Sequence, residues 1–577
     1  MLAAATSREG CNLGSLALYG PLLQELGLAA IMDQYLCRDP RQEYSHGQVL
    51  AVLLQARLCE PLALMNVSHW AEESGAALLS GIPTAKLNDD RLGRALDAFF
   101  EQRHSVLAQV TAAALKWADV SLDHLHFDPT HLTFTGGYEN SEPRPVYSRG
   151  QSMPSNGRLP AAHIGHGYLS KRRMLQVGVA AFVDEINFVP IFVHPLDGNR
   201  NGHTAMQQQY DLMRQYLKLS DGLMMISDRG TFSAEHVARL YRHGNTVLCA
   251  LPWNDYVKLY DSHAATLQWQ RASFLSQEQT RRRQCASPLP REQYDLAVID
   301  HAVPDELPAA ADMPADRKIP ARVIFVKSSS AAQLEAQRRE KNIDKIQKGL
   351  TTLAAKLLRG HPCNTPDSAH RNILRLMGKK SAAQVFCYDI VLLTPQEQAA
   401  LPAPQSGHRR ATHQLLWSLH QAAAEQAKQY DGLYALLTTA PADRFSADAL
   451  FTRYKQQAYI ERSHHEWKTP LAVTPVFLQS PQRVEALVCL LFMALQFRQI
   501  IERRYRLASQ NDKLLSQRRM TAEKLEKSFR TCLAWHGNVA GRHTLLPTTA
   551  SKTQRLILQT LRFPSLARQL LPKERSG

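Results

Sequence analysis

The order of short apolar runs and helical patterns between residues 121 and 253 constrains the fold of this chain more than any other feature. The run LDHLHFDPTHLTF predicts a first strand, and MLQVGVAAFV and NFVPIFVHPL flank the turn residues Asp184 and Glu185, which predicts an antiparallel hairpin. Met206, Tyr210 and Met213 then recur at helical spacing. Three strands followed by a helix predict the first half of an α/β domain.

The following runs complete this domain. GLMMIS predicts a strand that ends at Asp228, a helix is opened by Ser233 and closed before Gly244, and NTVLCALPW predicts a further strand. Three strands, a helix, a strand, a helix and a strand is the order of a ribonuclease-H-like (retroviral-integrase-like) core. We therefore expect an α/β fold of this kind.

Helical patterns fill the N-terminal part of the chain. Asn88 or Asp89 is placed to cap a helix whose apolar side is formed by Leu92, Ala95, Leu96, Phe99 and Phe100. The earlier segment SHGQVLAVLLQARL predicts another helix. Short paired helices in a basic protein are compatible with a helix-turn-helix, but an ordinary helical bundle is the favoured interpretation.

The α/β order breaks after Trp253. Proline-rich sequence with the isolated runs YDLAVID and ARVIFVK leads to a basic helix, and the core resumes at YDGLYALLT. A helix then starts near Ser446 and stops at Thr469 and Pro470, since proline disfavours helix at the residue before it. The predicted domains are a helical N-terminal domain for DNA binding or assembly (1–120), a first core segment (121–253), an inserted domain (254–429), a second core segment (430–505) and a basic helical C-terminal region (506–577).

Charge suggests the class of partner. The chain has 577 residues, of which 44% are hydrophobic, so it is long enough for several domains with buried cores. Its 68 lysines and arginines exceed its 52 aspartates and glutamates, which gives a net charge of +16. Such a field attracts polyanions, and nucleic acid is the leading partner. Acidic membranes and simple solubility are alternative explanations of the same charge.

Other features argue against secretion and membrane insertion. The nine cysteines form no C-x-x-C pair, which is typical of reduced packing residues and not of a zinc site or disulfide framework. The first residues contain neither the basic stretch nor the apolar run of a secretory signal. The apolar stretch from Ala486 to Phe497 is shorter than the roughly 20 residues that cross a bilayer, which predicts a buried helix. We expect a cytoplasmic, nucleoid-associated protein with no membrane partner.

Three acidic residues fall where this fold would bring them together. Asp128 lies in the first strand, Asp228 ends a neighbouring strand, and Glu461 lies on the helix after the insertion. Three carboxylates at one sheet edge would supply the oxygen ligands that two Mg²⁺ ions require. Each acid also has a structural interpretation, because Asp128 and Asp228 could shape turns and Glu461 could pair with Arg462 or Lys468. For a fourth acid, Asp197, turn chemistry is favoured.

Polar groups accompany Glu461 on its predicted helix. At 3.6 residues per turn, one face would carry Tyr454, Gln457, His464, His465 and Lys468 beside this acid. Ammonium, amide and aromatic groups suit a surface that holds a nucleic-acid backbone. The pattern therefore predicts DNA-binding residues around a catalytic carboxylate.

A family resemblance runs along the same residues. In order, the matching segments are LNDDRLGRALD, HFDPTHLTFTGGY, GHGYLSKRRMLQVGVAAFVDE, HPLDGNRNGHT, SDRG, YDGLYALLTT and YKQQAYIERSHHEWK. The chain resembles insertion-sequence DDE transposases of the type marked by Y-(2)-R-(3)-E-(6)-K, with a β-rich insertion between the second aspartate and the glutamate. Tyr454, Glu461 and Lys468 match this motif in type and spacing, whereas Gln457 stands where the family has arginine.

The resemblance implies roles for these residues. Asp128, Asp228 and Glu461 would be the catalytic triad that binds two Mg²⁺ ions, for which Mn²⁺ can substitute, while Tyr454, Gln457 and Lys468 would contact transposon-end DNA. The implied partners are the terminal inverted repeats and target DNA, and pairing of two ends implies a homodimer. Since glutamine is uncharged, we expect a weaker grip at Gln457 than arginine would provide.

The sequence also bears on competing functions. HHEWK lacks the paired histidines of H-E-x-x-H, and RLMGKKS has Ile373 where a phosphate-binding loop needs glycine, so no nucleotide cofactor is expected. The main alternative is a catalytically weak or inactive protein that binds transposon ends, as a regulator or decayed copy. A second alternative is a metal-dependent nuclease on the same core.

Overall fold

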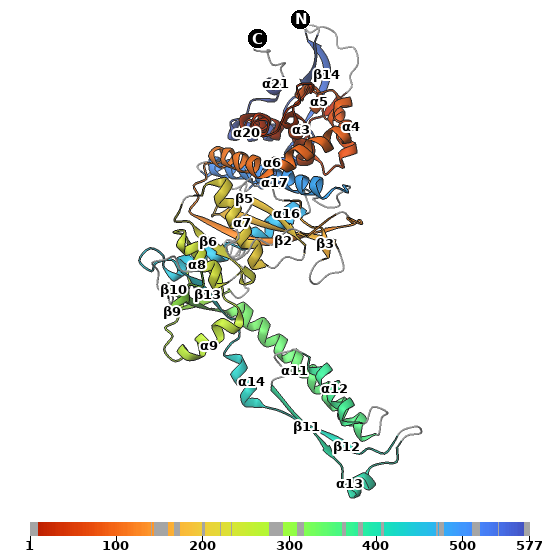
Figure 1. The fold of residues 1–577 in the computed structure, drawn as a ribbon, viewed down its shortest axis with the longest axis vertical. Coiled ribbons are helices and arrows are strands. Elements are labelled where there is room, and N and C mark those ends of the chain that lie inside the picture. The colour runs from red at the N-terminus through yellow and green to blue at the C-terminus, as the bar shows by residue number, and fades with distance from the viewer. Residues whose placement is uncertain are drawn as a thin grey trace.

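The computed structural model places a mixed α/β body between two terminal segments and an extended arm (Figure 1). The described residues are 10–570 except 140, 144–159, 167–172, 199–201, 220, 232, 276–291, 308–316, 360–364, 379–384, 405–408, 469–470, 472–477, 511–519 and 540–541. Ten strands form the main sheet, which holds the body together.

Five strands of this sheet follow the predicted order. Antiparallel strands β2 (His124–Phe134), β4 (Arg173–Val183) and β5 (Phe188–Asp197) are joined by parallel strands β6 (Met224–Ser227) and β7 (Thr246–Ala250), in the spatial order β5-β4-β2-β6-β7. Helices α7 (Gly202–Leu217) and α8 (Ala234–Arg242) connect the last three strands, and the short β3 (Gly165–His166) pairs with the start of β4. The chain order and the sheet order are consistent with a ribonuclease-H-like core.

Local turn and cap chemistry agrees with the expectations for this core. Asp184 Oδ1 accepts hydrogen bonds from the backbone N–H groups of Ile186 and Asn187, and this turn joins β4 to β5. The Ser233 side chain caps α8, which ends before Gly244, a glycine with a φ of +71°. β4 and β5 are buried because α6 (Asp89–Trp117), α7 and α17 (Pro481–Ser509) pack against them.

Residues 254–429 do not form one separate inserted domain, which corrects the predicted boundary. After α9 (Trp253–His263) and β8 (Gln270–Arg271), strands β9 (Tyr294–Pro304) and β10 (Lys318–Ser328) extend the main sheet. β10 pairs antiparallel with β13 (Leu433–Thr438), and β13 pairs antiparallel with β7. These two apolar runs are therefore sheet neighbours of the core, a pairing that spans more than 100 residues and leaves no local signal.

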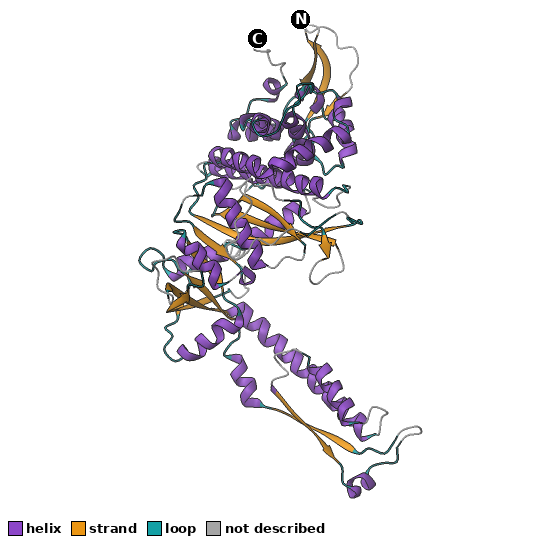
Figure 2. Cartoon of the chain, in the orientation of Figure 1, coloured by secondary structure: helices purple, strands orange, loops and turns teal. Residues whose placement is uncertain are grey.

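The remainder of the insertion projects from the body as an arm, which we define as residues 329–428 (Figures 1 and 2). Its elements are α11 (Ser329–Leu358), α12 (Pro366–Met377), β11 (Phe386–Leu392), α13 (Pro395–Ala400), β12 (His413–Leu419) and α14 (Gln421–Lys428). β11 and β12 form a two-stranded ribbon that packs on α11 and α12 around a small core of its own. The arm is mostly helical, so the expectation of a β-rich insertion is wrong for this part.

The two ends of the chain share one structural unit. The N-terminal elements are β1 (Gly10–Asn12), α1 (Leu16–Glu25), α2 (Leu28–Asp33), α3 (His46–Cys59), η1 (Leu64–Asn66), α4 (Val67–Glu73), α5 (Ala76–Ser80), η2 (Thr84–Lys86) and α6, which Asn88 caps. The C-terminal elements are α19 (Ala522–Phe529), β14 (Leu533–Val539), β15 (Arg542–Pro547), α20 (Lys552–Leu561) and α21 (Leu566–Gln569). β14 pairs with both β1 and β15 in a three-stranded sheet.

The expectation that residues 506–577 are helical is therefore wrong for β14 and β15. Cys532 and Ala534 are buried whereas Leu533 and Trp535 are exposed, which is the two-residue alternation of a strand. The basic composition of the region hid this short alternation. The N-terminal region is helical as expected, apart from β1.

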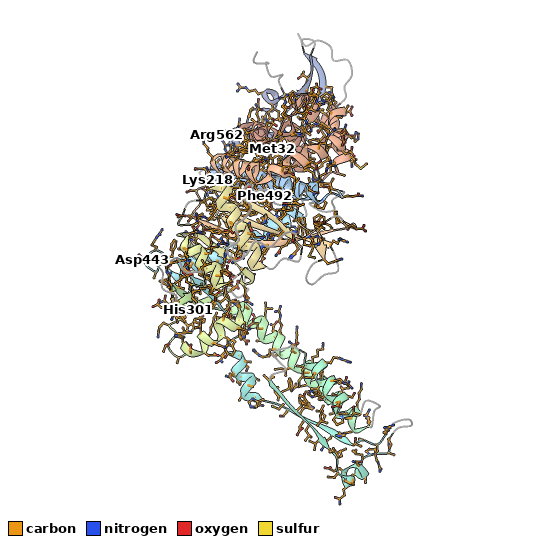
Figure 3. The ribbon with its side chains drawn as sticks, in the orientation of Figure 1. Met32, Lys218, His301, Asp443, Phe492 and Arg562 are labelled. Carbon is orange, nitrogen blue, oxygen red and sulfur yellow. The ribbon has the colours of Figure 1, made fainter. Side chains whose placement is uncertain are left out.

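Helix α17 is the buried helix expected around residues 486–497. Figure 3 labels Phe492 within the packed region between the terminal unit and the sheet, and this side chain is fully buried. In the part of the chain that the structure describes, α17 is the one continuous helix long and apolar enough to cross a membrane, and that apolar segment is entirely covered by protein. A bent pair, α3 with residues 64–73, passes the same test of length and composition.

Candidate active site

Asp128 and Asp228 lie on neighbouring parallel strands of the main sheet, at the level where β6 ends. β2 and β6 are parallel, and the pairing of Phe127 with Ser227 places the two aspartates at the next position of each strand. Paired residues on adjacent strands point to the same face of a sheet. The Asp128 side chain is mostly buried, with 21% of its surface exposed, whereas Asp228 is exposed just beyond the end of β6. The predicted neighbourhood of the two aspartates is present in the fold.

Glu461 reaches this level of the sheet from helix α16 (Ala458–Lys468), which packs against β2 and α17. Ile460 and Trp467 are fully buried and seven residues apart, so they fix the side of the helix that faces the core. Glu461 directly follows Ile460, and Lys468 directly follows Trp467. Both are exposed beside the buried side of the helix. Glu461 makes no ion pair with Lys468 in the structure, and the side chain of Arg462 is outside the described residues.

The helix predicted from Ser446 to Thr469 is in fact two helices. Ser446 caps α15 (Ala447–Lys455), and α16 begins after Gln456 and Gln457. The junction has tightened hydrogen bonds, from Gln457 N–H to the Tyr454 carbonyl and from Ile460 N–H to the Gln457 carbonyl. Leu450 of α15 and Ile460 of α16 pack into different cores, which favours a break between them. Tyr454 and Lys468 therefore belong to separate helices.

The electrostatics of Asp128 connect all three acids. Burial and, to a smaller extent, the negative charges of Asp228 and Glu461 together raise the pKa of Asp128 to about 7, whereas the charge of Lys468 opposes the shift. Burial penalises the charged form, and neighbouring negative charges do the same. The pKa of Asp128 therefore depends on the charges of both other acids and of Lys468.

His464 is a neighbour of Asp128 to which the sequence alone assigned no specific role. Its Nδ1 lies 3.7 Å from Asp128 Oδ2. Burial and the positive charge of Lys468 lower the pKa of His464 to about 4, so the ring is neutral at pH 7 and the contact is not an ion pair. His464 stands three residues after Glu461, which predicts that both lie on the same face of a helix. This spacing alone does not distinguish a histidine of the site from a surface histidine.

The predicted DNA-binding residues differ in how they interact with these acids. Burial raises the pKa of Tyr454, and the charge of Asp228 raises it further, so this hydroxyl is protonated near the second aspartate. Burial lowers the pKa of Lys468, whose charge interacts with Asp128. Gln457 lies at the helix junction, and its buried Oε1 has no hydrogen-bond partner among the described residues.

A second lysine approaches Glu461 from the other helix. Burial lowers the pKa of Lys455, while the negative charges of Glu292 and Glu461 raise it. Its ammonium group also lies 4.8 Å from the centre of the Tyr294 ring, a cation–π contact. Lys455 was missed in the sequence because its nearest partners come from the insertion and from the next helix.

Asp197 has a structural role and lies apart from this cluster. It is the last residue of β5, it is buried, and it accepts a hydrogen bond from the backbone N–H of His163 at 2.9 Å. It thus holds the segment before β3 against the sheet. The turn expected after Asp197 falls on residues 199–201, which lie outside the described residues.

The chemistry of the three acids fits hard divalent cations. Carboxylate oxygens are the ligands that Mg²⁺ prefers, and a cation would offset both the burial of the Asp128 charge and its repulsion by Asp228 and Glu461, which raise the pKa of Asp128. In the described part of the chain, no group of three or more His, Cys, Asp or Glu side chains is close enough to hold a metal ion. The acids therefore interact through their charges without forming a closed set of ligands.

Comparison with protein families is consistent with this geometry. Residues 124–497, well over half of the chain, match the model of the Transposase DDE domain, and residues 10–112 match a domain of unknown function, DUF4277. No curated protein matches the chain. The family match begins at β2 and ends within α17, so it includes both aspartates, the arm and α16. This chain belongs to the DDE transposase family.

Proposed function

We propose that this protein cuts DNA at the ends of an insertion sequence and joins the resulting 3′-hydroxyl ends to target DNA. One observation carries the proposal: Asp128 and Asp228 are in register on parallel strands, and Glu461 adds to the charge that raises the pKa of Asp128. Members of the DDE transposase family act on DNA and generally use divalent metal ions. The proposal assigns Asp128, Asp228 and Glu461 as the residues that hold two Mg²⁺ ions, with Mn²⁺ as a substitute.

The surrounding residues have separate tasks in this mechanism. When bound, the metal ions supply Lewis-acid activation of the attacking oxygen and stabilisation of the leaving oxygen. Lys468 holds a DNA phosphate beside Asp128, and the protonated Tyr454 hydroxyl donates a hydrogen bond to the backbone near Asp228. His464 is neutral at pH 7, so it adds no positive charge that would compete with a cation at Asp128.

Substitution of the acids tests the catalytic assignment. Asp128→Asn, Asp228→Asn and Glu461→Gln are each expected to abolish Mg²⁺-dependent cleavage of labelled inverted-repeat DNA while binding of that DNA persists. Asp221→Asn is the matched control, because Asp221 precedes β6 and lies at the opposite end of the strand that leads to Asp228. Cleavage by a purified triad variant would remove that residue from the site.

The same assay separates the alternative functions. An end-binding regulator would bind the labelled DNA without cutting it, and the uncharged Gln457 in place of the family arginine, with a side-chain Oε1 that has no hydrogen-bond partner among the described residues, is the observation that favours this alternative. A nuclease would cut but would yield no joined product with target DNA. We propose a homodimer as the active form, since two ends must be held together for joining.

A further inference from the structure

One face of helix α11 is lined with basic side chains. We define the basic stripe as Arg338, Lys341, Lys345, Lys348 and Lys356, all of which are exposed. At 3.6 residues per turn these positions fall within an arc of about 80° and extend over roughly 27 Å of helix. Such alignment gives the arm a row of positive charge along one side of α11, with a gap at Thr352 between Lys348 and Lys356.

This row is turned away from the core of the arm. The buried residues of α11, Ile346, Leu350 and Leu357, lie on the other side of the helix, where α12 and β12 pack. Removal of apolar side chains from water sets this orientation, so the lysines do not have to bind anything for the arm to fold. The stripe is free to meet a partner.

A solvated helix surface usually mixes charges of both signs at positions four residues apart. On the stripe that pattern occurs once, where Lys348 pairs with Asp344 at 2.8 Å. Arg338, Lys341, Lys345 and Lys356 form no ion pair with any described residue. The whole arm, residues 329–428, has 14 lysines and arginines against 7 aspartates and glutamates. This excess of unpaired positive charge favours a polyanionic partner.

Sheet topology places the root of the arm at the edge that carries the candidate active site. β2, β6, β7 and β10 all run in the same direction, so their carboxyl ends share one edge. Through the strand pairs, Ile324 of β10 is level with Ala250 of β7, which in turn is level with Asp228. α11 starts five residues beyond Ile324, which places its first residue about 14 Å to the side of Asp228, at 4.8 Å per strand, and roughly 17 Å further along the strand direction, at 3.3 Å per residue.

The root of the arm is firmly attached to the body. Arg339 forms a two-pronged ion pair with Asp431, and the backbone N–H of Gly432 donates a hydrogen bond to Glu335 at 2.8 Å. α11 also continues directly from β10. The stripe is therefore held in a defined direction relative to the carboxylates.

We propose that the basic stripe of α11 binds the phosphate backbone of the duplex DNA whose cut site lies at Asp128, Asp228 and Glu461. This inference rests on the proposed function for the location of the cut site. A duplex carries a phosphate charge every 1.7 Å of its axis, so a straight row of about 27 Å can follow it for most of a helical turn. Contacts to phosphate give affinity and position without reading sequence.

The experiment compares two triple variants of the full chain. Lys341→Gln/Lys345→Gln/Lys356→Gln removes three charges from the stripe. Lys116→Gln/Lys218→Gln/Lys318→Gln removes three exposed charges, of which Lys116 and Lys218 lie in the chain before β2 and β6 and Lys318 is the first residue of β10, at the amino end of that strand. Figure 3 labels Lys218 on the body, far from the arm. The probe is a 40-base-pair duplex of mixed sequence, and binding is measured from 50 to 300 mM salt.

The stripe variant is expected to bind roughly 10- to 100-fold more weakly at 0.15 M salt, with a salt slope smaller by about 2.7, whereas the control keeps most of its affinity. Equal behaviour of the two variants would overturn the proposal. Loss of binding to vesicles containing 30% phosphatidylserine, with duplex binding intact, would overturn it in favour of a membrane surface. These results are independent of the triad test, which reads cleavage, and unchanged circular dichroism excludes misfolding as a cause.

Discussion

At the scale of single residues, Asp128 combines burial with repulsion. Its pKa is about 7 because it lies in a poorly hydrated position and faces the charges of Asp228 and Glu461. An acid whose pKa is raised by folding destabilises the native state once it must be charged, because the unfolded chain loses that proton at lower pH. The free energy of unfolding should therefore fall as the pH rises from about 4 to about 7.

Asp128→Asn is expected to stabilise the metal-free protein above pH 7 and to change it little below pH 4. The rise of the Asp128 pKa from 3.8 to about 7 corresponds to a gain of up to roughly 4 kcal/mol. Urea unfolding in the presence of a chelator, at pH 4.5 and pH 8, measures it. Asp221→Asn serves as the control. A gain of equal size at both pH values would show that the charge of Asp128 is not its source.

At the scale of secondary-structure elements, α6 and α17 are joined by a charged pair inside the core. Arg103 Nε lies 2.7 Å from Glu485 Oε1, and both side chains are essentially inaccessible to water. Glu485 also accepts a hydrogen bond from the backbone N–H of Ala162, and Arg103 donates one to the Phe100 carbonyl. The pair is thus fully hydrogen-bonded, which a buried charge requires.

Glu485→Ala is expected to lower the free energy of unfolding by about 3–5 kcal/mol, because it leaves the Arg103 charge buried without its partner. A matched control joins the same two helices: Arg483 and Asp97 pair at 2.7 Å with 32% and 46% of their side chains exposed. Asp97→Ala should cost less than about 1 kcal/mol. Urea denaturation measures both, and equal losses would contradict the effect of burial.

At the scale of the whole molecule, the N- and C-terminal elements share their hydrophobic core with the body, whereas the arm has a separate core. β1 from the start of the chain pairs with β14 from its end, and both contribute to the main core. The arm has a small core of its own. Residues far apart in the chain therefore stabilise one another at the termini, whereas the arm is a local unit.

Removal of residues 341–426, with Glu340 joined to Ala427 by a four-residue Gly-Ser linker, is expected to leave the melting temperature within about 4 °C of the full chain. The two ends are near each other, since Arg339 donates a hydrogen bond to the Ala427 carbonyl at 3.4 Å. Truncation after residue 510 should instead cause unfolding or aggregation, because it uncovers the core residues that α19 and α20 bury. Calorimetry and size-exclusion chromatography measure both, and a stable truncated chain would refute the shared core.

The main features that were predictable are those encoded in neighbouring residues. Periodicity, the Ser233 cap and the Asp184 turn predicted the βββαβαβ order, and that order predicted the meeting of Asp128 and Asp228. The helix junction at Gln456 and Gln457 was not predictable, because it arises from the different cores that α15 and α16 pack against. The contacts of His464 with Asp128 and of Lys455 with Glu292 were missed because each joins residues more than 100 positions apart in the chain.

The amino-acid sequence by itself determined which residues form the core strands and helices, because periodicity and capping act within a few residues. It also determined that acidic residues occupy positions 128, 228 and 461, since residue types and their order are part of the covalent structure. Only the tertiary structure decided that β9 and β10 join the main sheet, that β1 pairs with β14, and that α11 leaves the sheet at the carboxyl end of β10, a strand parallel to β2 and β6. Those outcomes depend on pairing between strands more than 100 residues apart, where burial and hydrogen bonding of the complete fold select the partner.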